Sequence, residues 1–259
     1  NITIRNFKIM RNINNFKNKI IEEKDITFSI CMATFNGEKF LNEQITTIIS
    51  QLDKKDELII SDDCSSDSTI DIVKSFNDKR IKIYKNNKNV GFIKNFEKAL
   101  SKATKKWILL ADQDDIWLNY KIELFKSIIY YKSDIGAIFS NHFILNENKK
   151  LSNKTYYDDL PSKIYIPYLN CHAHGPGIAF RTNLLKKILP FPKELKSHDQ
   201  WIGQLTSLIT KVYISRIPTQ IYRKHSDQFT HRIKRKLIKK FLSRFFMLKN
   251  LISRIYFEN

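Results

Sequence analysis

With 259 residues, of which 42% are hydrophobic, the chain is long enough for one large α/β domain or two small ones with a sizeable core. Its formal net charge of +19 indicates an anionic partner, such as nucleic acid, an anionic membrane or a phosphorylated substrate. Its 3 cysteines form no C-x-x-C pair, which argues against a disulfide framework or a zinc site and fits a reducing compartment, and no apolar run approaches the roughly 20 residues of a membrane span.

Residues 1–25 are rich in Asn, Lys and Arg and have only a loose apolar pattern. We expect a basic N-terminal extension that is either a weak helix or a disordered arm. The segment has no apolar signal-peptide core and begins with Asn rather than Met, so we expect a fragment or a processed chain.

From Thr27 onward, strand patterns alternate with helix patterns. Apolar runs predict strands over 27–34, 57–61, 80–84 and 107–111, and helical spacing of apolar residues follows each of the first three. This alternation is typical of βαβ units in a doubly wound, mostly parallel sheet flanked by helices. The sequence contains no G-x-G-x-x-G after the first strand and no G-x-x-x-x-G-K-[ST], which argues against a dinucleotide site and a P-loop.

Polar clusters follow three of these strands: Thr34 to Asn36, Asp62 with Asp63, and Asp112 to Asp115. In an open α/β sheet, ligands bind at the carboxyl ends of the strands, so we expect the three clusters to meet at one edge. Asp112 and Asp114 are two positions apart and leave the same face of an extended chain. Paired carboxylates suit Mg²⁺ or Mn²⁺, and a cation there can hold a diphosphate. The alternative is a solvated acidic turn in which Asp114 or Asp115 caps the next helix.

The second half of the chain is less regular. Apolar runs predict strands over 135–140, 178–180 and 212–215, and helices are expected over 183–189 and from Ser197 to about Thr210. Ser197 is a candidate helix cap, with Asp199 in the first turn. Likewise, Ser66 or Asp67 is a candidate cap for the helix after the second strand.

The last segment, 231–257, has apolar residues every three or four positions and basic residues between them. This pattern predicts a basic amphipathic helix that fits the surface of an anionic bilayer. The alternative is a helix that packs on the domain or on a twin subunit and leaves its basic face in solvent.

Five short motifs occur in an order and spacing that resemble glycosyltransferase family 2, the inverting nucleotide-sugar enzymes with the GT-A fold, and within it the bacterial rhamnosyltransferase-like enzymes of surface-polysaccharide assembly. They are Met-Ala-Thr-Phe-Asn-Gly at 32–37, Ser-Asp-Asp-Cys-Ser-Ser-Asp at 61–67, Asp-Gln-Asp-Asp-Ile-Trp at 112–117, His-Asp-Gln-Trp at 198–201 and Tyr-Arg-Lys-His at 222–225. The resemblance implies a GT-A catalytic domain over 26–230. Its nucleotide-binding half would be 26–140 and its acceptor half 141–230, with the extension 1–25 and the helix 231–259 outside.

The resemblance also implies roles for single residues on the donor side. Thr34, Phe35 and Asp63 would contact the nucleoside, with Asp63 accepting a hydrogen bond from the base. Lys94 would approach the donor. Asp112 and Asp114 match the Asp-x-Asp motif. Both are candidate metal residues: one of them, with Asp114 favoured over Asp112, would bind Mn²⁺ or Mg²⁺ directly, and the other would hold the ribose or a metal-bound water.

Two further roles lie downstream. Asp199 matches the catalytic base, and His225 matches a histidine that reaches the metal or the diphosphate. The sequence departs from the family where many members have an acidic residue before the base, because His198 stands there. From the residues alone, Asp199 can be a plain helix-start acid and His225 a surface histidine.

Several other residues keep two interpretations. His172 and His174 lie near Cys171 in no common zinc spacing, so they either line the acceptor site or are structural. Trp117 and Trp201 either stack on a sugar or belong to the core.

The resemblance implies an inverting, metal-dependent transferase on the inner face of the cytoplasmic membrane. Its donor would be a dTDP- or UDP-sugar, and its acceptor a glycan or a lipid-linked glycan. A homo-oligomer is compatible with the sequence. The rival hypotheses are a basic nucleic-acid-binding protein and an inactive scaffold. We expect no nucleic-acid partner, because the basic residues concentrate at the two ends and no interleaved aromatic and basic platform occurs.

Overall fold

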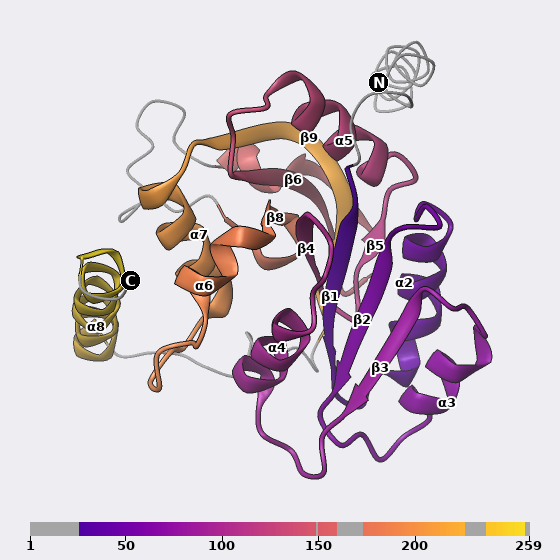
Figure 1. Ribbon diagram of the computed structural model, residues 1–259. Helices are drawn as coiled ribbons and strands as arrows, with labels where there is room; N and C mark the ends of the chain where they lie inside the picture. Colours follow the sequence, from indigo (N-terminus) through magenta and orange to yellow (C-terminus); the bar gives the residue numbers. More distant parts are fainter. Residues whose placement is uncertain (1–25, 149, 160–172, 226–236, 257–259) are drawn as a thin grey trace.

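A mixed β-sheet runs through the middle of the molecule, and helices pack against its faces (Figure 1). The computed structural model describes residues 26–148, 150–159, 173–225 and 237–256. The sheet has 9 strands in the order β3-β2-β1-β4-β8-β6-β9-β5, with β7 paired to β6. The strands are β1 (Phe28–Thr34), β2 (Glu57–Asp62), β3 (Ile81–Lys85), β4 (Trp107–Ala111), β5 (Ile116–Trp117), β6 (Ala137–Leu145), β7 (Leu151–Thr155), β8 (Ile178–Arg181) and β9 (Val212–Arg223).

The helices lie between these strands in the sequence. The α-helices are α2 (Glu38–Ile49), α3 (Thr69–Ser75), α4 (Phe92–Ser101), α5 (Lys121–Tyr131), α6 (Leu185–Ile188), α7 (His198–Ile209) and α8 (Leu237–Tyr256). Three short 3₁₀ helices are η1 (Tyr156–Asp159), η2 (Gly175–Gly177) and η3 (Thr182–Leu184). The predicted extension over 1–25 lies outside the described residues.

The first half of the sheet is parallel, with β1 between β2 and β4 and with β3 outside β2. β1, β2 and β4 are buried along their length, as expected for parallel strands with helices on both sides. Alternate residues of β1 face opposite layers. Ile30 and Met32 belong to the core that includes α2 and α5, and Cys31 belongs to the core that includes α4 and α7. The predicted doubly wound sheet is therefore confirmed.

The second half of the sheet mixes directions. β8 runs antiparallel to both β4 and β6, and β6 runs parallel to β9. The predicted strand over 212–215 is longer, because β9 follows β6 through two register irregularities as far as Arg223. The helix predicted over 183–189 is confirmed in part: its first residues belong to the 3₁₀ helix η3, and the α-helix α6 covers only Leu185–Ile188.

One of the two predicted helix caps is confirmed. The Ser197 hydroxyl accepts a hydrogen bond from the Gln200 N–H at the start of α7. The cap predicted at Ser66 or Asp67 is wrong, since the cap position of α3 is Ser68. Asp67 instead accepts the N–H groups of Glu38 and Thr69, both at 3.0 Å, and thereby links the starts of α2 and α3.

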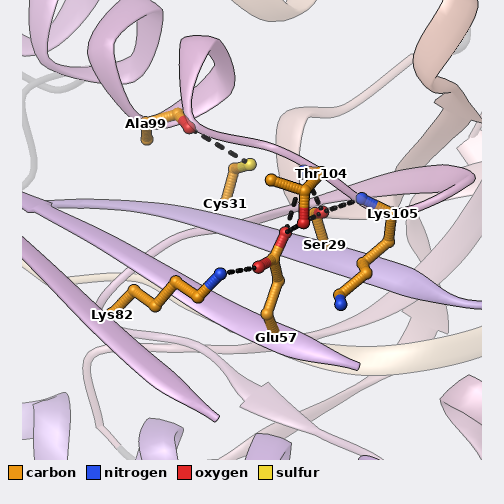
Figure 2. Close-up of polar contacts among 7 residues, drawn as sticks. All are labelled: Ser29, Cys31, Glu57, Lys82, Ala99, Thr104 and Lys105. Atoms are coloured by element: carbon orange, nitrogen blue, oxygen red, sulfur yellow. Dashed lines mark hydrogen bonds and ion pairs between the residues drawn. The ribbon is translucent and has the colours of Figure 1, made fainter. Parts of the chain in front are cut away.

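A buried carboxylate, Glu57, ties the amino-terminal ends of β1 and β2 to the loop before β4 (Figure 2). Its Oε1 accepts the Ser29 hydroxyl at 2.6 Å, the Thr104 hydroxyl at 2.8 Å and the Thr104 N–H at 2.9 Å, and its Oε2 accepts Lys82 Nζ at 2.5 Å. Burial raises the pKa of Glu57, but these hydrogen bonds outweigh burial and bring the pKa from 4.5 to about 2. The ionised carboxylate therefore stabilises the edge of the sheet opposite the polar clusters.

Replacing Glu57 with Gln is expected to lower the free energy of unfolding at pH 7 by on the order of 2–3 kcal/mol. The pKa is depressed in the folded state, so the stabilisation is complete above pH 4.5 and is lost as the pH falls toward about 2. The difference between wild type and variant should therefore shrink over that window. Urea unfolding at pH 7, 4 and 3 measures it, with the exposed Glu147→Gln as the control. A difference that does not change with pH would contradict the role of the Glu57 charge.

Helix α8 packs beside α6 and α7 (Figure 1). Met247 and Leu251 are buried in the same core as Trp201 of α7. The Arg254 guanidinium is also buried, and it donates to the backbone carbonyls of Lys187, Leu189 and Pro190 at 2.8–3.0 Å. A second apolar face, formed by Phe245, Leu248, Ile252 and Tyr256, is exposed. None of the described helices is long and apolar enough to cross a membrane.

Candidate active site

The first two polar clusters meet at the carboxyl ends of β1 and β2, because Thr34 and Asp62 are partners in the sheet register. The Thr34 hydroxyl donates to Asp62 Oδ1 at 3.0 Å, and the Asp63 N–H donates to the Thr34 carbonyl at 2.9 Å. Asp62 also accepts the Ser65 N–H at 2.9 Å and the Ser65 hydroxyl at 2.5 Å. The hydrogen bonds of Asp62 therefore stabilise this edge of the sheet from within, whereas the Asp63 side chain makes no hydrogen bond to Thr34 or Ser65.

Asp63 organises the loop that leads from β3 into α4. Its carboxylate accepts the N–H groups of Val90 and Gly91, both at 2.8 Å, and the Asn86 side-chain amide at 2.9 Å. Gly91 has a φ of +86°, which favours glycine at this point. A carboxylate offers about four acceptor positions, so roughly one remains for an N–H of a nucleoside base.

The third cluster is joined to the first by Gln113, the middle residue of the Asp-x-Asp motif. Its side chain accepts the Phe35 N–H at 3.0 Å and donates to the Phe35 carbonyl at 3.2 Å. The Phe35 side chain itself is 45% exposed. A Cβ on Gly37 would lie 2.4 Å from Gln113 Oε1, so a side chain at this position would displace the Gln113 amide from Phe35. No role for Gln113 was predicted from the sequence, although its place between Asp112 and Asp114 is a signal that could have identified it.

Asp112 follows β4 directly, and Gln44 of α2 donates to its carbonyl at 2.7 Å. Burial and the charges of Asp114 and Asp199 raise the pKa of Asp112 well above its ordinary value. Asp199 starts α7, far away in the sequence, so its effect shows that the fold brings α7 to the same edge. Negative charge is thus concentrated where the sequence predicts a cation.

His225, two residues beyond β9, reaches the same place. Its Nε2 lies 2.8 Å from Asp114 Oδ2, and its ring packs against Phe40 of α2 at a centroid distance of 4.8 Å. The side chains of His225 and Asp114 are both mostly buried. The alternative of a solvent-exposed surface histidine is therefore wrong.

Asp199 is held in its ionised form by its neighbours. Burial raises its pKa, but His198, the Ser197 hydroxyl, His174 and the Gln200 N–H outweigh burial and hold the pKa below its ordinary value. The Ser197 hydroxyl and the Gln200 N–H both donate to Asp199 Oδ1. Asp199 is therefore ionised at neutral pH, and its Oδ2 is the oxygen left for a proton.

Asp115 is buried, so it does not belong to a solvated turn. Neither Asp114 nor Asp115 caps a helix, because the next helix, α5, begins at Lys121. Asp115 accepts the Gln220 side-chain amide at 3.2 Å. The Lys121 ammonium, also buried, donates to the Pro176 carbonyl at 2.7 Å and to Gln220 Oε1, and burial lowers its pKa to about 7. The burial of Lys121 beside the acidic residues was not predicted from the sequence, because a lysine at the start of a helix is normally exposed to solvent.

Two tryptophans next to the motifs belong to the core. Trp201 is fully buried and donates through Nε1 to the Ile188 carbonyl at 2.9 Å. Trp117 is 2% exposed, and the Lys121 ammonium nitrogen lies 4.1 Å from the centroid of the Trp117 ring.

The His198 ring stacks on Phe96 at a centroid distance of 4.0 Å. Lys94 is exposed on α4 and pairs with Glu97 at 2.7 Å.

The donor set fits a hard divalent cation only in part. Among the described residues, no three carboxylate, imidazole or thiol groups converge into a complete metal-binding cluster. Mg²⁺ and Mn²⁺ sites that bind substrate phosphates need only one or two protein ligands, because water and phosphate oxygens supply the rest. Asp114 and His225 match that requirement, and the mutual repulsion of Asp112, Asp114 and Asp199 favours a cation.

The α/β sheet with acidic residues at its carboxyl edge is the GT-A arrangement. The model of the family described as Glycosyl transferase family 2 matches residues 29–189, and the chain belongs to that family. The resemblance read from the five motifs is thereby confirmed.

Among curated relatives, the dTDP-rhamnosyl transferase RfbG of Shigella flexneri is 29% identical over 76% of this chain and 72% of its own. The UDP-Glc:alpha-D-GlcNAc-diphosphoundecaprenol beta-1,3-glucosyltransferase WfgD of Escherichia coli is 34% identical over 48% of this chain. The match spans only 49% of the length of the E. coli enzyme. Among solved structures, TarS 1-349 of S. aureus in complex with UDP-GlcNAc aligns with a TM-score of 0.71 and 20% identity, over 90% of this chain and 68% of that chain. This similarity confirms the predicted GT-A fold.

Proposed function

We propose that this chain is an inverting, metal-dependent glycosyltransferase of bacterial surface-polysaccharide synthesis. It transfers a sugar, rhamnose or a hexose, from a nucleoside diphosphate to a glycan or lipid-linked acceptor. The observation that carries the proposal is the meeting of Asp112, Asp114, Asp199 and His225 at one edge of the sheet. The names of the relatives, which include a UDP-glucose and a dTDP-rhamnose enzyme, support a UDP- or dTDP-sugar as the donor.

The donor side consists of Thr34, Phe35, Asp63 and Asp112. The remaining acceptor position of Asp63 takes an N–H of the base, and the exposed Phe35 ring offers an apolar surface to the nucleoside. Asp112 holds the ribose or a metal-bound water. Lys94 contributes only if it leaves Glu97, so we rank it last among the donor contacts.

Asp114 and His225 are the protein ligands for Mn²⁺ or Mg²⁺. When bound, the cation acts as a Lewis acid that stabilises the charge of the leaving diphosphate. This role explains why three carboxylates stand so close together. In the free protein the repulsion among Asp112, Asp114 and Asp199 is unfavourable, and a bound cation would remove this unfavourable interaction.

The chain's own chemistry is a single proton transfer. The acceptor hydroxyl oxygen forms a bond to the anomeric carbon while the bond from that carbon to the diphosphate oxygen breaks. The electron pair of the broken bond leaves with the nucleoside diphosphate, and the hydroxyl proton goes to Asp199. Because attack and departure occur on opposite faces, one displacement inverts the anomeric centre.

The exposed apolar face of α8 suits the surface of an anionic membrane. Phe245, Leu248, Ile252 and Tyr256 can enter the headgroup boundary while the positive charge of the chain attracts the lipid. A lipid-linked acceptor is then close to the active site. This arrangement corresponds to a peripheral protein on the inner face of the cytoplasmic membrane.

The test is protection against heat by nucleoside diphosphates. Thermal unfolding is measured with UDP, dTDP or GDP, each with and without Mn²⁺ or Mg²⁺. At a ligand concentration of about 100 Kd, binding adds about 2.7 kcal/mol of stability, so a clear rise in Tm is expected with UDP or dTDP plus metal. Sugar derivatives of the nucleoside diphosphates that protect the protein are then screened for metal-dependent hydrolysis.

Two outcomes separate the rival hypotheses. An inactive scaffold would be protected by nucleotide but would hydrolyse none of the donors. A nucleic-acid-binding protein would bind a generic oligonucleotide with a steep salt dependence, which we do not expect at moderate salt. Absence of protection by every nucleoside diphosphate with either metal would overturn the proposed function.

A further inference from the structure

Four aromatic rings from separate elements form one contiguous group, which we call the ring platform: His142 of β6, Tyr156 of η1, His174 before η2 and Tyr222 of β9. The His142 ring stacks on Tyr156 at a centroid distance of 4.6 Å and lies 4.4 Å from His174. Tyr222 meets His174 edge-on at 4.9 Å. His142 is buried, and the residues Tyr156, His174 and Tyr222 are half-buried.

The ring platform lies beside the proposed base. A Cβ built on Gly175, the residue after His174, would lie 3.6 Å from the Asp199 Cβ, so this turn lies next to Asp199 with room for about one methyl group between them. The charges of both Asp199 and Asp114 act on the His174 ring. His174 is therefore near both the atom that takes the proton and the proposed metal ligand.

The platform is held in place by a buried amide, Asn141. Its Oδ1 accepts the N–H groups of His142 at 2.9 Å and Tyr157 at 3.0 Å, and its Nδ2 donates to Thr155 Oγ1 at 2.7 Å and to the Arg216 carbonyl at 3.0 Å. One side chain thus fixes the turn that carries Tyr156 to both β6 and β9. Such pre-organisation reduces the entropy lost when a ligand binds.

The histidines of the platform also retain unused polar atoms. Within the described part of the chain, the Nδ1 atoms of His142 and His174 are buried and make no hydrogen bond. Burial lowers the pKa of both imidazoles, for His142 to about 2, so they are neutral at pH 7. Flat neutral rings with nearby hydrogen-bonding atoms suit a pyranose, which has an apolar C–H face and a rim of hydroxyl groups.

We propose that the ring platform is the binding subsite for the acceptor sugar, with Tyr156 and Tyr222 contacting its C–H face and His174 orienting the hydroxyl that attacks. The subsite rests on the proposed function, since it assigns the sugar acceptor of the same reaction. It names a pyranose, rather than the lipid or the diphosphate of the acceptor, as the part that the protein recognises.

Saturation-transfer NMR on the full chain tests this subsite. The probes are methyl α-N-acetylglucosaminide, methyl β-glucoside and methyl α-rhamnoside, each added to protein loaded with UDP and Mg²⁺, which is diamagnetic. At least one glycoside is expected to give a signal, strongest from the protons of one ring face. Tyr156→Ser and His174→Ala should lower it about fivefold, as expected for the loss of one aromatic contact. Tyr156→Phe should retain it.

The matched control is Tyr131→Ser, which removes an exposed tyrosine at the end of α5 and should leave the glycoside signal unchanged. UDP-dependent protection against heat should be equal in all variants, which also verifies that they fold. A glycoside signal that survives both Tyr156→Ser and His174→Ala overturns the subsite, as does the absence of any glycoside signal from a protein that UDP protects. Loss of UDP protection in Tyr156→Ser also overturns it, because the platform would then serve the donor. If UDP and dTDP fail to protect the wild type, the proposed function fails instead.

Discussion

Asp199→Asn is expected to lower the rate of sugar transfer about 10²- to 10⁴-fold, the contribution typical of a general base. The amide retains the size of the side chain and can still accept the Ser197 and Gln200 hydrogen bonds, so α7 should keep its start. It cannot take the proton of the acceptor hydroxyl. Donor binding does not use this carboxylate, so heat protection by a nucleoside diphosphate with metal should persist. Metal-dependent donor hydrolysis, measured on wild type and variant, is the first assay.

The control for this variant is Glu194→Gln, which makes the same carboxylate-to-amide change at an exposed position four residues before His198. It should behave as the wild type. Retention of full activity by Asp199→Asn would exclude Asp199 as the base and leave it as a helix-start acid. Loss of nucleotide protection would show that Asp199 serves binding instead of proton transfer.

Asp114→Asn is expected to have a similarly large effect through a different step. Loss of a charged metal ligand removes several kcal/mol of transition-state stabilisation, which corresponds to a fall in rate of about 10³-fold. Here protection by nucleotide plus Mn²⁺ should also be lost, which distinguishes this variant from Asp199→Asn. Without ligands the variant should be at least as stable as the wild type, because the repulsion that raises the pKa of Asp112 is reduced.

Thermal unfolding with and without UDP and Mn²⁺ measures both effects. Asp134→Asn is the control, since Asp134 is an exposed aspartate that pairs with Lys211 at 2.7 Å. A variant at Asp114 that loses activity but keeps the full metal-dependent rise in Tm would assign the metal to other residues. His225→Ala should weaken the same rise by a smaller amount, because the negatively charged ligand Asp114 remains.

Where local pattern decides structure, the sequence was sufficient. The strands β1, β2 and β4 are short apolar runs buried on both faces. The apolar runs predicted the strands of the sheet, and the polar residues that end them predicted the edge that carries Asp63 and Asp112. The cap at Ser197 followed from side-chain chemistry alone. These features depend on residues that are close together in the sequence, so a local sequence pattern is enough to predict them.

Features set by distant contacts were not predictable in the same way. Residues 212–223 form one strand only because β6 runs alongside, and β5 exists only because β9 pairs with it. The burial of Lys121 depends on Pro176 and Gln220, which lie far downstream. The approach of Asp199 and His225 to Asp114 came from family resemblance alone, since no local signal connects positions so far apart.

The continuity of the sheet has a consequence for how such a protein moves. β4, which carries the Asp-x-Asp motif, is hydrogen-bonded to β8, and β8 to β6, so both halves share one ladder. Opening the halves like a hinge would break that ladder, at a cost far above thermal energy. The two halves of the sheet are therefore expected to move as one rigid unit, so a change of substrate would depend on the loops at the carboxyl edge rather than on the spacing of the halves.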